Sequence, residues 1–374
     1  MDKMRRFIDI SVPVTTCNFR CHYCYITHNG LFANKLPKFP ISPVDFGRAM
    51  SRKRLGGTCL LNFCGDGETL LPPEMVDFVR AVLDEGHYVM IVTNGTVTTA
   101  FEKFAKFPPS HLARLFFKFS FHFQQLEEHK LFDRFFTNVR MMRDAGASFT
   151  VELTPIDEMI PRQEELKQMC LRELGAIPHS TVARDQHDMV NLPLFSKLSN
   201  EEYKKAWQTF SSALFDYKFS VFGKKRHEFC YAGDWAAFLS LGTGVLTQCN
   251  CTLTSQNIFE DIDSPIKFQA IGHFCRLPHC YNAHSWLTLG TIPHLAAPTY
   301  ADVRNRHCID GSEWLKPQMK AFLSQKLGEN NQEYSFVRRV MTDCNMFARL
   351  FRRKIAVGRN KVATWLMRIR SRGQ

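Results

Sequence analysis

The chain has 374 residues, of which 45% are hydrophobic and 22% are charged, and its formal net charge is +12. A chain of this length can bury a sizeable core, so one large domain with one or two additions is expected. No apolar run is long enough to span a membrane, and the apolar stretch near the N-terminus is too short for a signal peptide. We therefore exclude an integral membrane protein and expect a cytoplasmic location.

The thirteen cysteines form no regular framework, and their number is odd. This argues against secreted disulfides and favours thiols that are reduced or bound to metal. Much of the excess positive charge lies after Asp343, beyond which no acidic residue occurs. That segment holds Arg349, Arg352, Arg353, Lys354, Arg359, Lys361, Arg368, Arg370 and Arg372. No nucleic-acid-binding motif is recognisable in it, so nucleic acid is not expected as a partner.

From residue 7 to about 215, short apolar runs alternate with longer amphipathic ones, which is the pattern of β/α units and a parallel sheet. The predicted strands are 7–13, 58–64, 87–93, 115–122, 148–154 and 179–184. The predicted helices are 43–54, 73–86, 97–107, 127–145, 161–174 and 200–215. The sequence therefore predicts an α/β fold in which functional residues gather where the strands end.

Three cysteines, Cys17, Cys21 and Cys24, follow the first predicted strand at C-x3-C-x2-C spacing. A four-iron cluster normally takes four cysteine ligands, so a loop of three thiolates leaves one iron open to another molecule. Soft thiolates favour an iron-sulfur cluster or zinc over hard cations. A structural zinc loop is the alternative interpretation, although zinc loops usually show C-x2-C pairs and a fourth ligand.

This motif, with an aromatic residue just before its last cysteine, resembles the signature of the radical S-adenosylmethionine (SAM) superfamily. The resemblance implies a partial (β/α)6 TIM-like barrel and a [4Fe-4S] cluster held by Cys17, Cys21 and Cys24. It also implies that SAM binds the open iron through its amino and carboxylate groups. Reductive cleavage of SAM then yields a 5'-deoxyadenosyl radical, which takes a hydrogen atom from a substrate.

Other residues at strand ends resemble the SAM contacts of that superfamily. The segment that follows the second strand, with Gly65, Gly67 and Glu68, resembles its Gly-Gly-Glu-Pro motif, although Asp66 and Thr69 replace the usual Gly and Pro. Glycines let a backbone approach a ligand closely, and a carboxylate accepts hydrogen bonds from an ammonium group. The resemblance adds Tyr23 as the residue that packs against adenine, and Asn94, Ser120 and Glu152 as further SAM contacts. Each of these could instead be a hydrogen-bonded core or turn residue.

A second cysteine pattern lies downstream, where Cys230, thirteen residues, Gly244, four residues and Cys249 follow one another. The residues between the two cysteines read as strand, glycine turn and strand. The pattern resembles the start of the SPASM and twitch extensions of radical SAM enzymes, which implies one auxiliary [4Fe-4S] cluster with Cys275 and Cys280 as further ligands. Cys251 and Cys308 are alternative ligands, and zinc is the alternative metal, because four cysteines also suit a tetrahedral zinc site.

The predicted organisation is a radical SAM core at 1–222, a small β-hairpin-containing iron-sulfur domain at 223–311 and a basic helical C-terminal extension at 312–374. In the extension, Val340, Cys344, Phe347 and Phe351 form one apolar face. We expect this face to pack on the domain. The alternative is a docking element for an acidic partner, nucleic acid or an anionic membrane surface.

The sequence thus predicts a radical SAM oxidoreductase or maturase-type enzyme that oxidatively modifies a peptide, a protein or a small molecule. A reducing partner such as flavodoxin or ferredoxin is implied by the resemblance. The alternative is a non-enzymatic iron-sulfur or zinc-binding protein for electron transfer or interaction. The catalytic residue that handles the final proton is not identifiable from the sequence.

Overall fold

The structure is a computed structural model, and it describes residues 2–352. Its sheet has nine strands in the order β6-β5-β4-β3-β2-β1-β7-β8-β9, and β1 to β6 run parallel to one another. These six strands are β1 (Arg6–Val12), β2 (Cys59–Gly65), β3 (Tyr88–Thr93), β4 (Leu115–Ser120), β5 (Ser148–Leu153) and β6 (His179–Ser180). The predicted α/β fold with six β/α units is confirmed.

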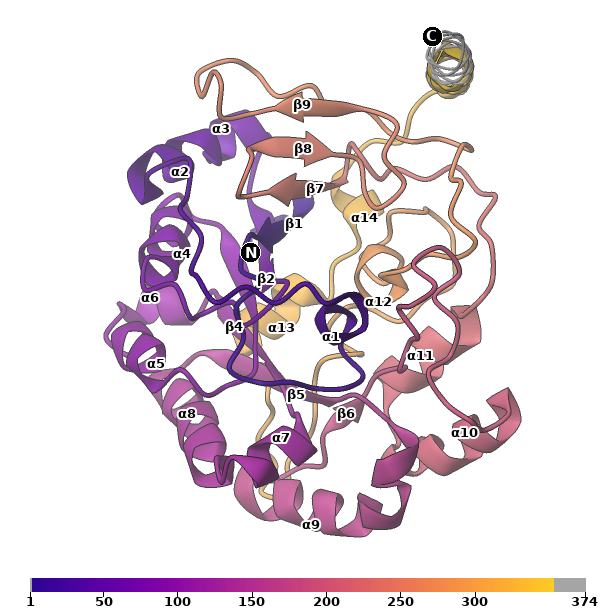
Figure 1. Cartoon of the computed structure of the whole chain (residues 1–374). Helices are drawn as coiled ribbons and strands as arrows, with labels where there is room; N and C mark the ends of the chain where they lie inside the picture. Colours follow the sequence, from indigo (N-terminus) through magenta and orange to yellow (C-terminus); the bar gives the residue numbers. More distant parts are fainter. Residues whose placement is uncertain (1, 353–374) are drawn as a thin grey trace, which may run out of the picture.

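Helices connect the parallel strands and, apart from α1, lie along the outside of the curved sheet (Figure 1). In the first part of the chain they are α1 (Tyr25–Asn29), α2 (Pro43–Ala49), α3 (Arg52–Leu55), α4 (Met75–Asp84), α5 (Thr98–Phe104), α6 (Pro109–Leu112), α7 (Phe123–Glu128), α8 (Phe132–Ala145), α9 (Gln163–Leu174), α10 (Asn200–Trp207) and α11 (Ala213–Val221). Two 3-10 turns, Asp157–Arg162 and Gln208–Phe210, precede α9 and follow α10. Later come α12 (Ala283–Trp286), α13 (Pro317–Leu323) and α14 (Leu327–Asn330). Among residues 2–352, none of the helices has the length and apolar character needed to cross a bilayer.

The last three strands extend the sheet beyond β1. Strand β7 (Ala236–Ser240) pairs with β1 in parallel, and β8 (Val245–Thr247) and β9 (Ser255–Asn257) follow as antiparallel neighbours. Gly244 lies in the turn between β7 and β8 with φ +72°, a backbone conformation that favours glycine. The predicted strand, glycine turn and strand are therefore present. The sheet passes without a break across the predicted domain boundary at residue 222, and the boundary itself stays a prediction.

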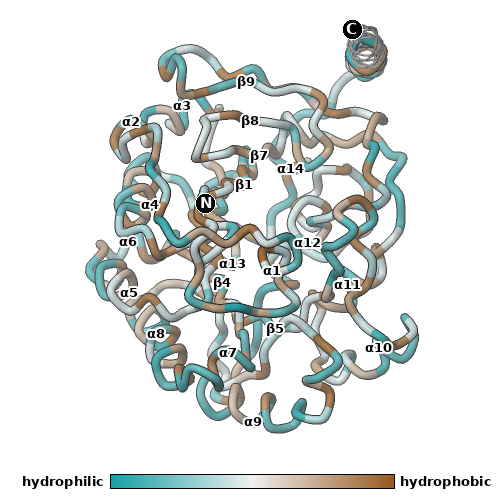
Figure 2. Tube along the Cα trace, viewed as in Figure 1, coloured by the Kyte–Doolittle hydropathy of each residue, from teal (hydrophilic) through white to brown (hydrophobic). Residues whose placement is uncertain are grey.

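Alternate residues of the parallel strands point to opposite sides of the sheet. On β4, Phe117 and Phe119 point outward and join the core that lies under the helices, whereas Phe116 joins a second core inside the barrel. In Figure 2 the strands at the centre carry many of the hydrophobic segments, while α9 and α10 are largely hydrophilic. This division leaves residues such as Lys118 and Ser120, which alternate with the outward pair, facing the barrel interior.

Helix α13 packs against the inner side of the sheet. The ring of Phe322 stacks on Tyr88 of β3 with centroids 3.6 Å apart, and Met319 and Leu323 are buried in the same core. This end of the barrel interior is therefore filled by apolar side chains. Space for polar groups remains toward the ends of the strands, where the first cysteine loop begins.

Two predicted elements differ from the observed ones. The helix predicted at 127–145 is two helices, α7 and α8, because the chain turns at Lys130, whose φ is +55°. The strand predicted at 179–184 pairs over only two residues, after which Arg184 forms a separate bridge with Leu194. In both places the regular spacing of apolar residues continues although the backbone conformation changes. The spacing of apolar residues alone therefore cannot predict where such an element ends.

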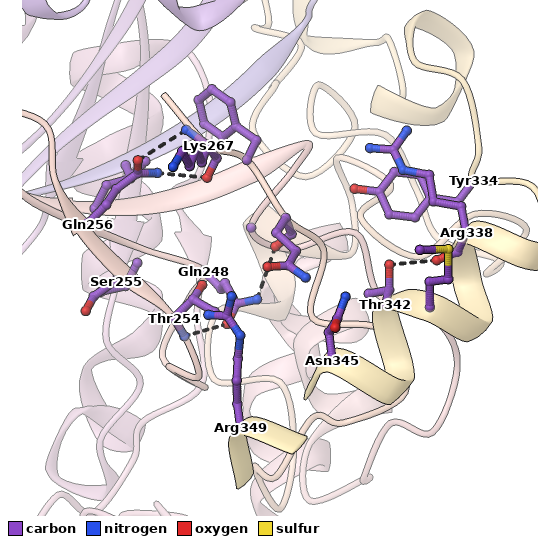
Figure 3. Close-up of a pocket in the computed structure, with 16 residues that line it drawn as sticks. Gln248, Thr254, Ser255, Gln256, Lys267, Tyr334, Arg338, Thr342, Asn345 and Arg349 are labelled. Carbon is purple, nitrogen blue, oxygen red and sulfur yellow. Dashed lines mark hydrogen bonds between the residues drawn. The ribbon is translucent and has the colours of Figure 1, made fainter. Parts of the chain in front are cut away.

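A further helix begins at residue 336 and continues to residue 352, where the described part of the chain ends. It borders a groove of about 410 Å³, whose other wall includes Gln248, Ser255 and Gln256 (Figure 3). The helix turns Thr342 and Met346 inward, and it leaves Phe347 and Phe351 exposed. The expectation that the Val340, Cys344, Phe347 and Phe351 face packs on the domain is wrong, because the buried side of the helix lies elsewhere on its circumference. The basic residues from 353 onward lie outside the described residues.

Candidate functional site

The first cysteine loop lies at the edge of the sheet where the parallel strands end. A cavity of about 190 Å³ is lined there by side chains and backbone from several strand ends. Its lining includes Cys17, Cys21, Cys24, Gly65, Gly67, Glu68, Asn94, Ser120 and His122. The structure thus brings together eight of the residues predicted to bind the first cluster and SAM. Parallel strands end on one side of the sheet, which is why residues so far apart in the chain meet.

The three thiols of the loop are largely buried. Burial raises the pKa of Cys17 to about 11 and that of Cys21 to about 12, and it also raises the pKa of Cys24. The backbone N–H of Phe19 donates to the Cys17 sulfur over 3.4 Å. A metal that binds these sulfurs must displace their protons, so the raised pKa values make metal loading depend on pH.

Gly67 lets the loop after β2 lie directly against the chain that leads into the cysteine loop. A Cβ atom on Gly67 would overlap the carbonyl oxygen of Thr16. The next residue continues the contact, because the backbone N–H of Glu68 donates to the same carbonyl oxygen over 3.0 Å. The glycine is therefore required by a close approach of two backbones, and the two loops are held as one unit.

Glu68 is buried between the ends of β2 and β3. Its carboxylate accepts hydrogen bonds from the Thr93 hydroxyl at 2.6 Å, from the Asn94 backbone N–H at 2.6 Å and from the Leu70 backbone N–H at 3.1 Å. Burial raises its pKa. A carboxylate offers about four acceptor positions, so one remains for a ligand donor in the cavity.

Asn94 and Ser120 line the same cavity, and Tyr23 contacts His122, another of its lining residues. The side-chain amide of Asn94 donates to Asn18 within the cysteine loop over 2.7 Å, which ties the end of β3 to that loop. The Tyr23 hydroxyl lies 2.8 Å from Nδ1 of His122, whose pKa burial lowers to about 4. His122 is therefore neutral at physiological pH. Ser120, the last residue of β4, lines the cavity directly.

Glu152 lies apart from the other predicted SAM contacts. Its carboxylate forms ion pairs with Lys118, at 3.1 Å, and with the fully buried Arg304. It is nearly inaccessible inside the barrel, at the end of β5. The side chain is thus engaged by two cations of the chain itself, and its role as a SAM contact stays a prediction.

The second group of cysteines lines a small pocket beside the β7–β8 hairpin. Cys230, Cys249, Cys275 and Cys280 all contribute to its wall, together with the apolar side chains of Ile271, Leu277, Trp286, Leu287 and Ile292. Burial raises the pKa of Cys230 to about 12. The four cysteines come from the start and end of the hairpin and from a loop that follows it, and the fold gathers them at one place.

Cys251 is a close neighbour of this group. Its backbone N–H donates to the Cys249 sulfur over 3.2 Å, and its own sulfur accepts from the Arg276 backbone N–H, also over 3.2 Å. Cys308 lies elsewhere, against Gly175 at the end of α9, and its thiol donates to the Leu174 carbonyl. Of the two alternative ligands, only Cys251 lies beside the second group.

The remaining cysteines are outside both groups. Cys59 and Cys170 are buried in the core under the helices, and Cys344 is exposed on the helix that begins at residue 336. Cys64 alternates on β2 with the outward Phe63 and so faces the barrel interior.

Sequence reasoning missed a group of charged residues inside the barrel. Lys118, Arg184, Lys218 and Arg304 come from β4, the segment after β6, α11 and the segment before α13. The sequence did contain one signal, because Lys118 is a single charge in the otherwise apolar strand Leu115–Ser120. The others lie in segments whose position relative to the sheet only the tertiary structure defines.

It also missed His28, Asp185 and His187, which bring potential metal-ligand atoms within 4.8 Å of one another. Nδ1 of His187 lies 2.7 Å from the Asp185 carboxylate, and the two imidazole rings stack with centroids 4.0 Å apart. Two imidazoles on one ion would each direct a ring nitrogen toward it, so a metal would require one ring to turn. As it stands, the group is a set of hydrogen-bonded and stacked side chains.

Comparisons with known proteins agree with the first cysteine loop. Residues 11–166 match the family model for the radical SAM superfamily. A comparison with curated proteins gives no match.

Among solved structures, the chain is similar to SuiB of Streptococcus suis bound to SAM, with 15% identity and a TM-score of 0.46 over 69% of this chain and 64% of SuiB. It thus spans less than two thirds of the length of SuiB. It is also similar to anSMEcpe with bound SAM and the Cp18Cys peptide, with 14% identity and a TM-score of 0.45 over 95% of this chain and 99% of that one. It is similar as well to BtrN in complex with SAM and 2-DOIA, with 11% identity and a TM-score of 0.31 over 88% of this chain and 92% of BtrN.

These structural similarities are low, and the assignment is made on the sequence match. The matched segment begins on β1 and extends into α9, so it contains the cysteine loop and the strand ends that line the cavity. Residues 11–166, which include Cys17, Cys21 and Cys24, therefore match the radical SAM superfamily.

Proposed function

We propose that the protein reductively cleaves SAM and uses the resulting 5'-deoxyadenosyl radical to take a hydrogen atom from an unreactive C–H position of a substrate. The observation that carries this proposal is the single cavity lined by Cys17, Cys21 and Cys24 together with the strand-end residues. When bound there, a [4Fe-4S] cluster with SAM would supply the radical. Three soft thiols on one short loop fit such a cluster.

The chain's own residues would hold SAM in this cavity. Gly65 and Gly67 would line the SAM site with their backbone, and Glu68 has an acceptor position left for an ammonium group. Asn94 and Ser120 offer further hydrogen-bonding groups, and Tyr23 is positioned through its contact with His122. The neutral His122 adds no positive charge that would repel the SAM sulfonium.

We further propose that Cys230, Cys249, Cys275 and Cys280 hold one auxiliary [4Fe-4S] cluster of the SPASM or twitch type. All four line one pocket together with apolar side chains, and a four-iron cluster normally takes four cysteine ligands. Zinc with the same four cysteines is the alternative.

An auxiliary cluster would accept the electron that remains on the substrate after hydrogen abstraction, so the net reaction would be an oxidation. The proposed substrate is a peptide, a protein or a small molecule, and the enzyme would be of the oxidoreductase or maturase type. SuiB has been crystallised with its precursor peptide SuiA, anSMEcpe with a peptide and BtrN with 2-DOIA. A reducing partner such as flavodoxin or ferredoxin, in a reducing compartment, would supply electrons for SAM cleavage.

The test is anaerobic reconstitution with iron and sulfide, followed by reduction with dithionite in the presence of SAM. We expect 5'-deoxyadenosine and methionine as products and about eight irons per chain, for two four-iron clusters. The Cys21→Ala variant should form no 5'-deoxyadenosine, whereas Cys344→Ser, which changes an exposed cysteine outside both groups, should retain it. A loaded protein that yields no 5'-deoxyadenosine would instead support the non-enzymatic alternative.

A second variant tests the auxiliary cluster separately. Cys249→Ala should lower the iron content from about eight to about four per chain. It should leave the cleavage of SAM in place, because Cys249 does not line the cavity of the first loop. An unchanged iron content, or zinc in place of the missing iron, would contradict the auxiliary cluster.

A further inference from the structure

The barrel interior holds four positively charged side chains close together. Lys118 points inward from β4, between the outward-facing Phe117 and Phe119. Lys218 lies on the buried side of α11, and Arg184 is half-buried after β6. Arg304 is completely buried. Lys118 retains 19% of its side-chain exposure, so open space lies next to it inside the barrel.

The chain supplies too few negative charges to balance them. Glu152 pairs with both Arg304 and Lys118. Asp9 accepts a hydrogen bond from Asn62 at 2.7 Å, and burial raises its pKa to about 6. With both carboxylates ionised and all four cations protonated, the interior therefore carries an excess of two positive charges.

In the described part of the chain, the two cations that have no carboxylate partner are Arg184 and Lys218. Lys218 donates to the Thr181 hydroxyl over 2.5 Å, and Arg184 donates to the Tyr281 carbonyl over 2.7 Å. Within residues 2–352, neither cation has a carboxylate within 4.0 Å. A buried charge without a counter-ion is costly, so this arrangement is stabilised by any anion that enters.

The ionisation of the lysines reflects this lack of an anion. Burial, together with Arg304 and Arg184, lowers the pKa of Lys118 to about 8. Burial and the neighbouring Arg184 and Lys118 lower the pKa of Lys218 well below its usual value. The cations thus repel one another in the absence of a ligand, and an anion between them would relieve that repulsion.

These cations also connect the two cysteine sites. Lys118 shares an inward strand face with Ser120, which lines the cavity of the first cysteine loop. Arg184 contacts Tyr281, which lines the pocket of the second cysteine group next to Cys280. A molecule held by Lys118 and Arg184 would therefore lie between the place where a radical forms and the place that accepts an electron.

We propose that the barrel interior binds an anionic group of the substrate, a carboxylate or a phosphate, through Lys118, Arg184 and Lys218. This inference rests on the proposed function, because it names the class of substrate for the same site. It narrows the class of substrate to molecules that present a carboxylate or a phosphate to the barrel interior, and so excludes neutral sugars.

The test uses the anaerobically reconstituted protein and isothermal titration calorimetry, with inorganic phosphate in one arm and acetate in the other. We expect saturable binding in at least one arm, and the tighter arm identifies the anion. Lys218→Met, which keeps the length of the side chain and removes its charge, should weaken binding roughly tenfold or more. Lys204→Met, on the exposed side of α10, is the matched control and should bind as the wild type does.

Thermal unfolding gives a second readout that does not depend on turnover. Without added anion, Lys218→Met should melt at a higher temperature than the wild type, since the substitution removes a buried amine that lies beside other cations and has no carboxylate partner among the described residues. Added phosphate or acetate, whichever binds, should raise the melting temperature of the wild type and of Lys204→Met by more than that of Lys218→Met.

Absence of saturable binding in both arms, or equal binding by Lys218→Met and wild type, would overturn the inference. Equal binding by Lys218→Met and wild type would mean that the cations balance the charge of an iron-sulfur cluster beside Cys280. Formation of 5'-deoxyadenosine without substrate should be unchanged in Lys204→Met, because this lysine lies on the exposed side of α10. Failure of the wild type to cleave SAM would count against the proposed function alone.

Discussion

At the scale of single residues, Gly67 is a position where the structure leaves no room for any side chain. The loop after β2 and the chain before Cys17 approach each other so closely that only a hydrogen atom fits between Gly67 and Thr16. In sequence this glycine resembles a ligand contact, and in the structure it is also a spacer between two protein backbones.

Gly67→Ala should therefore displace the cysteine loop relative to Glu68. We expect the rate of 5'-deoxyadenosine formation to fall roughly a hundredfold, as displacements of about 1 Å commonly do to catalytic geometry. Gly328→Ala is the control, because a Cβ atom there would meet its nearest neighbour, Trp235, at an ordinary 3.5 Å. Equal rates for the two variants would show that the close approach does not position the loop.

Lys118 gives a pH-dependent prediction. Its pKa is about 8, so it is protonated below that pH and becomes neutral above it, and an anion that binds beside it favours the protonated form. Anion binding should therefore take up protons and be tighter at pH 7 than at pH 9. The charged and titratable groups around it are Asp9, Cys64, His122, Glu152, Arg184, Lys218, His284 and Arg304.

Sulfate is a suitable probe for this prediction, since its two charges are constant over that range. Calorimetric titrations in buffers with different ionisation enthalpies measure the protons taken up. Lys118→Met should bind sulfate more weakly and with a smaller dependence on pH. An affinity of the wild type that is the same at pH 7 and pH 9 would contradict the role of this lysine.

The same residues show what sequence can reveal about the site. Cys17, Cys21 and Cys24 are eight residues from first to last, so their spacing alone predicts a shared ligand. The ion pair of Glu152 and Arg304 joins positions about 150 residues apart, and no local pattern relates them. The sequence therefore predicted the cluster ligands as a group and could not predict which strand-end polar residues are already engaged by the chain.

At the scale of elements, strands were easier to predict than helix boundaries. The five longest parallel strands begin within one residue of their predicted starts, because each is a compact apolar run between polar segments. Helices α7 and α8 were predicted as one, since the break at Lys130 changes the backbone and leaves the apolar spacing nearly intact.

The β7–β8 hairpin carries a testable role for Gly244. Its φ is +72°, and a Cβ atom would lie 2.5 Å from the Asn257 side chain of the adjacent β9. Gly244→Ala should distort the hairpin that ends at Cys249, and we expect the iron content to fall from about eight toward about four per chain. SAM cleavage should persist, because neither Gly244 nor Cys249 lines the cavity of the first cysteine loop.

Gly223→Ala is the matched control for this variant. Gly223 has a similar φ of +68°, but its Cβ atom would meet open space. A strained backbone alone would affect both variants alike, whereas crowding at β9 affects only Gly244→Ala. Iron content and 5'-deoxyadenosine are measured on both proteins, and loss of SAM cleavage in Gly244→Ala would show that the two cysteine sites are not separable.

At the scale of the whole molecule, the helix that begins at residue 336 is tied to the second cysteine group. Asp343 accepts from the His273 backbone N–H at 3.1 Å and lies 2.7 Å from the His273 ring nitrogen. His273 precedes Cys275 by two residues, and Cys230 bridges to the neighbouring Gly272. The helix therefore restrains the loop that carries two of the four cysteines.

Asp343→Ala should loosen that loop. We expect a chelator to remove iron from the auxiliary site about fivefold faster, which corresponds to a loss of about 1 kcal/mol from a partly exposed hydrogen-bonded pair. Cys344→Ser changes the adjacent, exposed position and should lose iron at the wild-type rate. Equal rates for both variants would show that the helix packs beside the loop without restraining it.

The pairing of β7 with β1 also limits which segments of this chain could be replaced by segments of another protein with the same fold. Strand β1 is hydrogen-bonded on one side by β2 and on the other by β7, which lies more than 220 residues further along the chain. A fragment that stopped before β7 would expose the edge of β1 along its whole length, and such an edge invites pairing with another molecule and aggregation. An engineer who replaces the second half of this chain must therefore supply a strand in the place of β7, so the smallest unit that can be transplanted is larger than the cysteine-bearing segment itself.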